Sequence, residues 1–119
     1  MSELSSAHSR LFVVCLCAAW CRTCDDYRGT FDTLAREFGS AARFDWVDIE
    51  DDEVALGGVE VDDFPTLLIA RGDEIAFFGP VMPYASAARQ LVQRALQGRL
   101  GVVTDAALAG LPTRLRARR

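Results

Sequence analysis

The sequence predicts one α/β domain, a mixed four-stranded sheet with helices on both faces. The first observation is that the hydrophobic pattern changes from a continuous apolar run to helical spacing and back to a strand. The second is a pair of apolar runs joined by a glycine turn and followed by a further helical pattern. A chain of 119 residues, 50% of them apolar and 25% charged, is long enough to bury the core of one such domain.

The first half of the domain is predicted to run strand, helix, strand. Leu11–Cys17 is uniformly apolar, which indicates a buried strand. Phe44–Ile49 indicates a second strand, and the outward carboxylates of Asp45 and Asp48 would discourage pairing with another chain if this strand is an edge. Between the two strands, the apolar residues repeat every three or four positions, as on one face of a helix: Cys24, Tyr27, Phe31, Leu34 and Phe38.

The second half is predicted to hold a short helix, a hairpin and a longer helix. Residues 51–56 can form the short helix, because two glycines follow them. The hairpin consists of strands 66–70 and 74–78, which Arg71-Gly72-Asp73 connects as a turn. The final helix is expected over residues 84–97, where the apolar residues again have helical spacing.

The chain divides into three parts on this pattern. Residues 1–10 form an N-terminal segment, 11–99 the domain, and 100–119 a C-terminal extension. The extension is expected to add a short helix within residues 102–111. Its end is expected to be disordered, because it is dense in like charges: Arg114, Arg116, Arg118 and Arg119.

Two cysteines stand where the first strand leads into the helix, in Trp20-Cys21-Arg22-Thr23-Cys24. At a helix N-terminus the unpaired N–H groups and the macrodipole favour negative charge, and Arg22 adds a positive charge, so Cys21 is expected to form the nucleophilic thiolate. The two intervening residues complete one helical turn. Cys24 can therefore reach back to Cys21 and close or open a disulfide with little backbone movement.

A second motif, Phe64-Pro65-Thr66, lies at the start of the first hairpin strand. With the Trp20–Cys24 segment it resembles the thioredoxin family over about residues 11–97. Further segments match in order and spacing: Val47–Glu50, Arg71–Glu74 and Gly79. The resemblance implies a thioredoxin-like fold from which the extra N-terminal strand and helix are largely missing. It also implies a cis bond before Pro65 and a protein thiol-disulfide oxidoreductase that needs no bound cofactor.

The resemblance also assigns roles to residues. Cys21 would attack the disulfide of a partner protein, Cys24 would resolve the mixed disulfide, and an external disulfide reductase would return the pair to the dithiol. A groove beside Pro65 would receive the substrate segment. The residues expected to line it are Trp20, Arg22, Thr23, Phe64, Pro65, Phe78 and Gly79.

The chain departs from the family beneath the cysteine pair. Cys15 stands where thioredoxins commonly carry a buried carboxylate, and Trp46 where a lysine is usual. The usual proton acceptor for the resolving thiol is therefore missing from its place. Cys15 is expected to be a small apolar core residue. Cys17 is nearer the site, where a regulatory or mixed disulfide through it remains open.

Two alternatives belong to other functional classes. The four cysteines within residues 15–24 could nominally form a tetrathiolate zinc site. Since Cys15 and Cys17 lie on the same face of a strand and Cys15 is expected deep in the core, we expect no metal. The other alternative is a non-catalytic interaction module with the same fold. Activity on protein disulfides and stoichiometric zinc would discriminate among the three.

Composition argues against nucleic acid and membranes as partners. The formal net charge is −4, and the body without the arginine-rich tail is more acidic still, so general binding of nucleic acid by the body is disfavoured. There is no lysine, which excludes lysine chemistry. The apolar run Leu11–Ala19 is too short to span a bilayer, and its removal as a signal peptide would delete the strand that presents the cysteines. The sequence therefore favours a cytoplasmic protein, in a compartment that keeps thiols reduced.

Overall fold

A computed structural model describes residues 10–118, so Arg119 and residues 1–9 of the predicted N-terminal segment lie outside the described residues. The structure contains one four-stranded sheet in the order β2-β1-β3-β4. β1 pairs with β2 in parallel and with β3 antiparallel, and β3 pairs antiparallel with β4. The predicted mixed sheet is thus confirmed, with β2 at an edge. The strands are β1 (Leu11–Cys17), β2 (Ala42–Asp48), β3 (Thr66–Arg71) and β4 (Glu74–Pro80).

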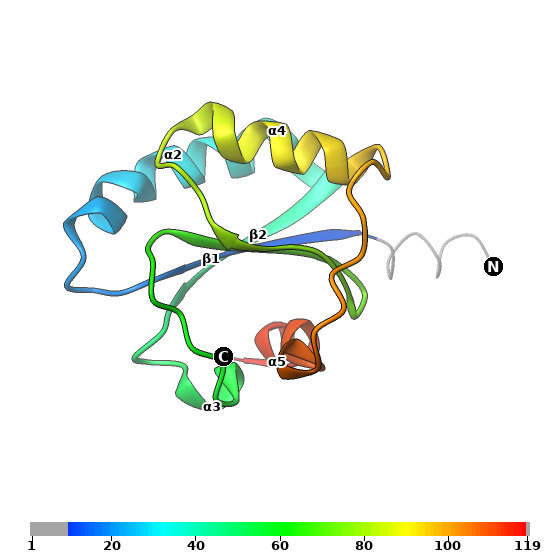
Figure 1. The fold of residues 1–119 in the computed structure, drawn as a ribbon. Helices are drawn as coiled ribbons and strands as arrows, with labels where there is room; N and C mark the ends of the chain where they lie inside the picture. The colour runs from blue at the N-terminus through cyan, green and yellow to red at the C-terminus, as the bar shows by residue number, and fades with distance from the viewer. Residues whose placement is uncertain (1–9, 119) are drawn as a thin grey trace.

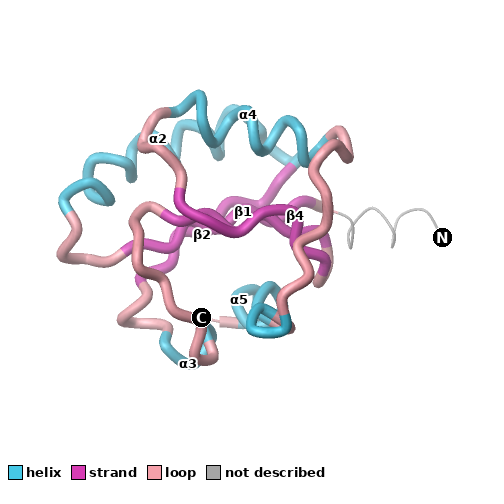
Figure 2. The backbone as a smooth tube through the Cα atoms, viewed as in Figure 1, coloured by secondary structure: helices cyan, strands magenta, loops and turns pink. Residues whose placement is uncertain are grey.

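Helices cover both faces of this sheet (Figures 1 and 2). The longer helices α2 and α4 lie on one face, and the short helices α3 and α5 lie on the other. The helices are α2 (Arg22–Phe38), α3 (Glu53–Leu56), α4 (Ala85–Leu96) and α5 (Leu111–Ala117), with 3-10 turns at Gly39–Ala41 and Ala106–Leu108. None of the helices within residues 10–118 is long and apolar enough to cross a membrane.

The central strand β1 divides the core into two layers. Its alternate residues Leu11, Val13, Cys15 and Cys17 belong to the cluster beneath α2 and α4. Phe12, Val14 and Leu16 belong to the cluster beneath α3 and α5. All seven positions of β1 are buried, because successive side chains point to opposite faces and both faces are covered. This is why the strand is apolar throughout instead of alternating.

The C-terminal extension is ordered, and the expectation that its arginine-rich end is disordered is wrong. Residues 111–117 form α5, while the helix expected within residues 102–111 is only the 3-10 turn. Leu108, Leu111 and Leu115 are at most 5% exposed in the α3/α5 core layer. Leu111 and Leu115 are four residues apart on one face of α5, and Leu108 reaches the same layer from the preceding 3-10 turn. This burial outweighs the repulsion among the arginines.

The arginines of α5 hydrogen-bond to backbone carbonyls of other elements. Arg114 Nε donates to the carbonyl of Ala55 at 2.9 Å, and its Nη2 donates to the carbonyl of Leu56 at 3.3 Å, both at the end of α3. Arg116 Nη2 donates to the carbonyl of Gly72 in the hairpin turn at 2.7 Å. The charges that suggested disorder are therefore part of how the extension is anchored.

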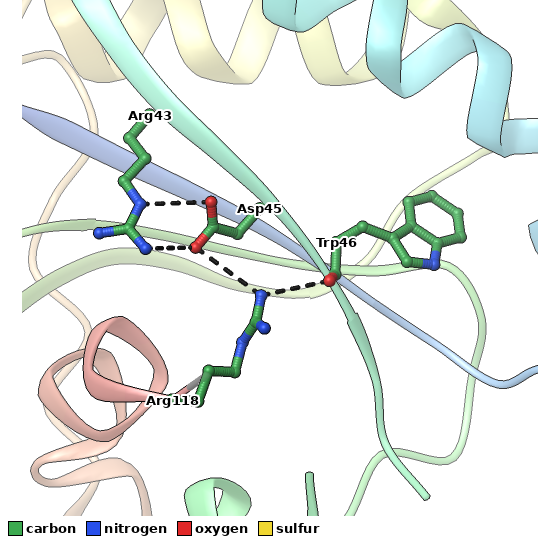
Figure 3. A network of polar contacts seen from close by, with 4 residues as sticks. All are labelled: Arg43, Asp45, Trp46 and Arg118. Carbon is green, nitrogen blue, oxygen red and sulfur yellow. Dashed lines mark hydrogen bonds and ion pairs between the residues drawn. The ribbon is translucent and has the colours of Figure 1, made fainter. Parts of the chain in front are cut away.

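Arg118 extends this anchoring to the edge strand (Figure 3). Its Nη2 donates to the carbonyl of Trp46 at 3.2 Å and lies 3.7 Å from a carboxylate oxygen of Asp45. Asp45 also pairs with Arg43 on the same strand, at 2.8 Å. An edge strand offers unpaired carbonyls to other chains, so a guanidinium bound to one of them protects the edge of β2.

Candidate functional site

The junction between β1 and α2 presents Cys21. Its backbone N–H donates to the carbonyl of Ala18 at 3.0 Å, which closes a tight turn after the strand. Cys21 is the N-cap of α2, with extended backbone angles, and its carbonyl accepts the N–H of Asp25 at 3.2 Å to begin the helix. The thiol is free and partly exposed. It therefore lies at the end of the helix where backbone N–H groups have no helical partner.

The structure contains a disulfide between Cys17 and Cys24. The two Cα atoms are 5.9 Å apart, a separation common for disulfides. Each of these residues is only 1% exposed. The sequence predicted that Cys24 closes a disulfide with Cys21, and here the structure differs, because Cys21 remains a free thiol.

The different pairing has a geometric cause. Cys17 is the last residue of β1, and its side chain belongs to the core layer beneath α2. Cys24 is the first buried residue of α2, so it points down to the same layer. The end of β1 supplies one sulfur to this layer from the sheet, and the start of α2 supplies the other from the helix above it. The alternation of side chains along β1 already placed Cys17 on this face, and that was the available signal for its role.

Cys15 lies deeper in the same layer, as expected for a core residue. It is 0% exposed, and its Sγ is 3.7 Å from Cys17 Sγ. Burial raises the pKa of the Cys15 thiol well above its ordinary value, although the positive charge of Arg28 partly opposes this. Arg28 itself lies over the ring of Trp46, 4.7 Å from its centroid. Cys15 is therefore held as a neutral thiol beneath the disulfide.

Tyr27 completes the layer below the cysteines, one turn after Cys24. It is 1% exposed, and nothing in the described part of the chain hydrogen-bonds its hydroxyl. Burial raises the pKa of Tyr27, and the nearby Cys15 contributes in the same direction. The hydroxyl is thus a neutral, unpaired polar group in an otherwise apolar layer.

An aromatic pair borders the cysteines on the surface. The ring of Trp20, a residue that is 67% exposed, contacts Phe64 edge to face, with 5.5 Å between the ring centroids. The Phe64–Pro65 peptide bond is cis, the isomer that the family resemblance implies. The antiparallel register of β1 and β3 brings Pro65 beside the strand end that carries Cys17. The structure therefore gathers three of the predicted groove residues around the cysteines.

The other predicted groove residues are distributed differently. Arg22 and Thr23 are exposed on the first turn of α2, directly after Cys21. Phe78 and Gly79 line a separate pocket of about 140 Å³, formed with the loop 60–63, whose lining includes neither Trp20 nor a cysteine. Phe78 also packs on the core layer beneath α3 and α5.

The described residues offer no cluster for a metal ion. Within residues 10–118, no group of three or more His, Cys, Asp or Glu side chains is arranged to hold one. Two of the four cysteines are joined to each other, so they have no thiolate to offer as ligands. The free, partly exposed thiol of Cys21 next to a buried disulfide provides the groups that thiol-disulfide exchange needs.

Comparisons with known proteins support the fold and the family. The thioredoxin family profile matches residues 2–89. Among solved structures, the chain is similar to thioredoxin from Fasciola hepatica, with 23% identity, coverage of 78% of this chain and 88% of that one, and a TM-score of 0.66. It is also similar to thioredoxin from Trypanosoma brucei brucei, with 21% identity, coverage of 82% of this chain and 86% of that one, and a TM-score of 0.64. A third similar structure is the germline-specific thioredoxin Deadhead from Drosophila melanogaster, with 20% identity, coverage of 78% of this chain and 88% of that one, and a TM-score of 0.66.

No curated protein sequence matches the chain significantly. The structural likenesses, all below 25% identity, establish the fold, and the profile covers more than half of the sequence, including both motifs on which the resemblance was based. The thioredoxin-like fold and a thiol-disulfide redox role in general follow. The chain belongs to the thioredoxin family.

Proposed function

We propose that this protein is a thiol-disulfide oxidoreductase that exchanges electrons with protein disulfides through Cys21 and Cys24. One observation supports this above all others: Cys21 is the partly exposed cysteine at the start of α2, while the other three cysteines are at most 1% exposed. A thiol at that place is accessible to the disulfide of a partner protein. The disulfide already formed behind it supports redox activity of the neighbouring sulfurs.

The reaction proceeds in two exchange steps. The Cys21 thiolate attacks one sulfur of a substrate disulfide, whose S–S bond breaks and releases one substrate thiolate. In the reduced protein, Cys24 then loses its proton and attacks Cys21 Sγ, which releases the second substrate thiol and leaves a Cys21–Cys24 disulfide. Two electrons have passed to the substrate. An external disulfide reductase supplies two electrons to restore the dithiol.

The aromatic border supplies a surface for the substrate. Trp20 and Phe64 offer apolar area beside Cys21, and Pro65 lies next to the strand end, so an extended segment of a partner protein can lie across them. Arg22 and Thr23 contribute polar contacts on the helix side. The partners are thus disulfide-containing proteins and the reductase, in a cytoplasmic setting where the activity would contribute to cell redox homeostasis.

Reduction of insulin disulfides by dithiothreitol tests this proposal. The wild-type protein should accelerate the reaction, and Cys21→Ser should abolish the acceleration. Cys15→Ala is the matched control, because it removes another cysteine of the same region without touching the exposed thiol, and it should keep the activity. A wild-type protein that is folded by circular dichroism and does not accelerate the reaction would contradict the proposal and favour a non-catalytic interaction module.

A further inference from the structure

The Cys17–Cys24 disulfide carries an inference that rests on the proposed function and deepens it. We propose that Cys17 is a third redox cysteine. A disulfide formed between Cys21 and Cys24 during turnover is passed inward, which gives the buried Cys17–Cys24 disulfide and a free Cys21 thiol. The protein thereby has two oxidised forms, one at the surface and one in the core.

Cys24 is the residue that both forms share. It follows Cys21 by one helical turn on α2, and its Sγ is bonded to Cys17 at the end of β1 with the Cα atoms 5.9 Å apart. Its sulfur can therefore be reached from the helix start and from the strand end. The Cys17–Cys24 separation fits disulfide geometry, and the single helical turn between Cys21 and Cys24 lets those two residues pair as well. The exchange therefore needs a rotation of side chains and little movement of the backbone.

The exchange balances without any outside reagent. Cys17 loses its proton, and its thiolate attacks Cys24 Sγ within the Cys21–Cys24 disulfide. As the Cys17–Cys24 bond forms, the bond between Cys21 and Cys24 breaks, and Cys21 leaves as a thiolate that can take up the proton. One disulfide is present before and after, so no electrons are gained or lost.

The environments of the sulfurs favour the inward direction. The exchange ends with a neutral disulfide in the core and the free thiol at Cys21, which is partly exposed to solvent. The reverse direction leaves a thiol at Cys17, which is 1% exposed and 3.7 Å from the Cys15 sulfur. Burying a charge is unfavourable, so this core layer resists formation of the Cys17 thiolate that starts the reaction, and the exchange is therefore slow.

The two forms differ in what they can react with. In the inner form both disulfide sulfurs are shielded from external thiols, and Cys21 alone is available. Since Cys24 is then occupied, a mixed disulfide formed at Cys21 has no neighbouring thiol to resolve it. Cys21 is also the one accessible thiol that can reopen the inner disulfide, by attack on Cys24. The exchange therefore converts a dithiol exchanger into a protein that acts through a single thiol.

Disulfide mapping of the oxidised protein tests the proposal. Reduced protein is oxidised with diamide, quenched with acid and cleaved with trypsin and chymotrypsin. Chymotrypsin can separate Cys17 from Cys21 after Trp20, and trypsin can separate Cys21 from Cys24 after Arg22. Wild type should contain mainly the Cys17–Cys24 disulfide, and Cys17→Ala should contain Cys21–Cys24. Cys15→Ala, an equal truncation on the same face of β1, should map like wild type.

A native labelling experiment gives a second measure. Iodoacetamide should label Cys21 in oxidised wild type and should not label it in oxidised Cys17→Ala, where Cys21 is in the disulfide. A wild-type protein whose only disulfide is Cys21–Cys24, and whose Cys21 is unlabelled, would overturn the proposal.

Reduction kinetics keep the test decisive if Cys17→Ala does not fold. In Cys21→Ser the Cys17–Cys24 disulfide, formed by oxidation in denaturant and refolding, should be reduced by dithiothreitol at least about tenfold more slowly than in wild type, because the reductant must await opening of the core. Equal rates would contradict the passage of the disulfide through Cys21.

The mapping uses diamide and no protein substrate, so its result is independent of insulin reduction. If the protein reduces insulin and mapping finds only the Cys21–Cys24 disulfide, this inference is overturned and the proposed function stands. A Cys17–Cys24 disulfide in a protein that does not reduce insulin would support the inner pairing and overturn the proposed function.

Discussion

The Sγ of Cys15 lies 3.7 Å from the Sγ of Cys17, so a neutral thiol is packed directly beneath a disulfide in the layer under α2. No water reaches Cys15, which is 0% exposed, and burial raises its pKa. The position that commonly carries a carboxylate in this family is here an uncharged group at neutral pH. The stability of the fold should therefore respond to alkaline rather than acidic titration of this site.

Alkaline destabilisation is the first prediction. In the folded protein the pKa of the Cys15 thiol is raised above its ordinary value of 9.0. The protonated thiol therefore contributes its full share of stability below pH 9.0, and this share is lost as the pH rises above 9.0, because the unfolded chain then releases the proton more easily than the folded protein. Between about pH 8 and pH 10 the free energy of unfolding should fall by about 1.4 kcal/mol more in wild type than in Cys15→Ala. Urea unfolding at both pH values measures this difference. Equal slopes would mean that the buried thiol ionises as easily as in the unfolded chain.

The hydroxyl of Tyr27 gives the second prediction. Because it is buried and has no hydrogen-bond partner among the described residues, Tyr27→Phe should raise the free energy of unfolding by about 1 kcal/mol. Tyr84→Phe is the control, since Tyr84 is 58% exposed and should change little. Chemical denaturation of both variants provides the comparison. A clear loss of stability in Tyr27→Phe would show that the hydroxyl is bonded within the core.

The third prediction concerns the docking of α5. Leu115 is 0% exposed beneath the sheet, so Leu115→Ala should cost about 2 to 5 kcal/mol of unfolding free energy. Val102→Ala, in the same extension at a residue that is 55% exposed, should stay within about 0.5 kcal/mol of wild type. If the two variants unfold at the same denaturant concentration, α5 does not belong to the core.

Arg118 gives the fourth prediction, at the edge of β2. Arg118→Ala removes the hydrogen bond to the carbonyl of Trp46 and the ion pair with Asp45, and should cost about 1 kcal/mol. Arg118→Lys keeps the charge without the planar guanidinium and should recover only part of this. Thermal unfolding measures both, and sedimentation would detect any association through the uncovered edge. No loss in Arg118→Ala would mean that the contact is unimportant.

Some of this architecture could be predicted because its physical signal is local. The continuous apolar run of β1 reflects its burial on both faces. The start of α2 directly after Cys21 could be predicted from the helical spacing of the apolar residues that continues through Phe31. Within the described residues β2 is an edge strand of the sheet, where the outward carboxylates of Asp45 and Asp48 had been expected to discourage pairing.

Other features depend on contacts between distant elements. The period of β1 places Cys15 and Cys17 on one face, but which of them meets Cys24 depends on how far α2 begins beyond the strand end. The helix α5 is only seven residues long, so arginines make up much of this segment and suggested disorder. The helical spacing of Leu111 and Leu115 was the signal that the segment could fold. Charge alone was the wrong signal there, because each guanidinium of Arg114, Arg116 and Arg118 has carbonyl partners that only the folded chain supplies.

The most direct measurement for the central claim is capture of a substrate by Cys24→Ser. In this variant a mixed disulfide at Cys21 cannot be resolved, so incubation of the reduced protein with a disulfide-bonded peptide should give a stable one-to-one adduct, attached at Cys21 and released by dithiothreitol. Cys21→Ser should give no adduct, because its remaining cysteines are buried. No adduct with Cys24→Ser, or an equal adduct with Cys21→Ser, would contradict exchange through Cys21.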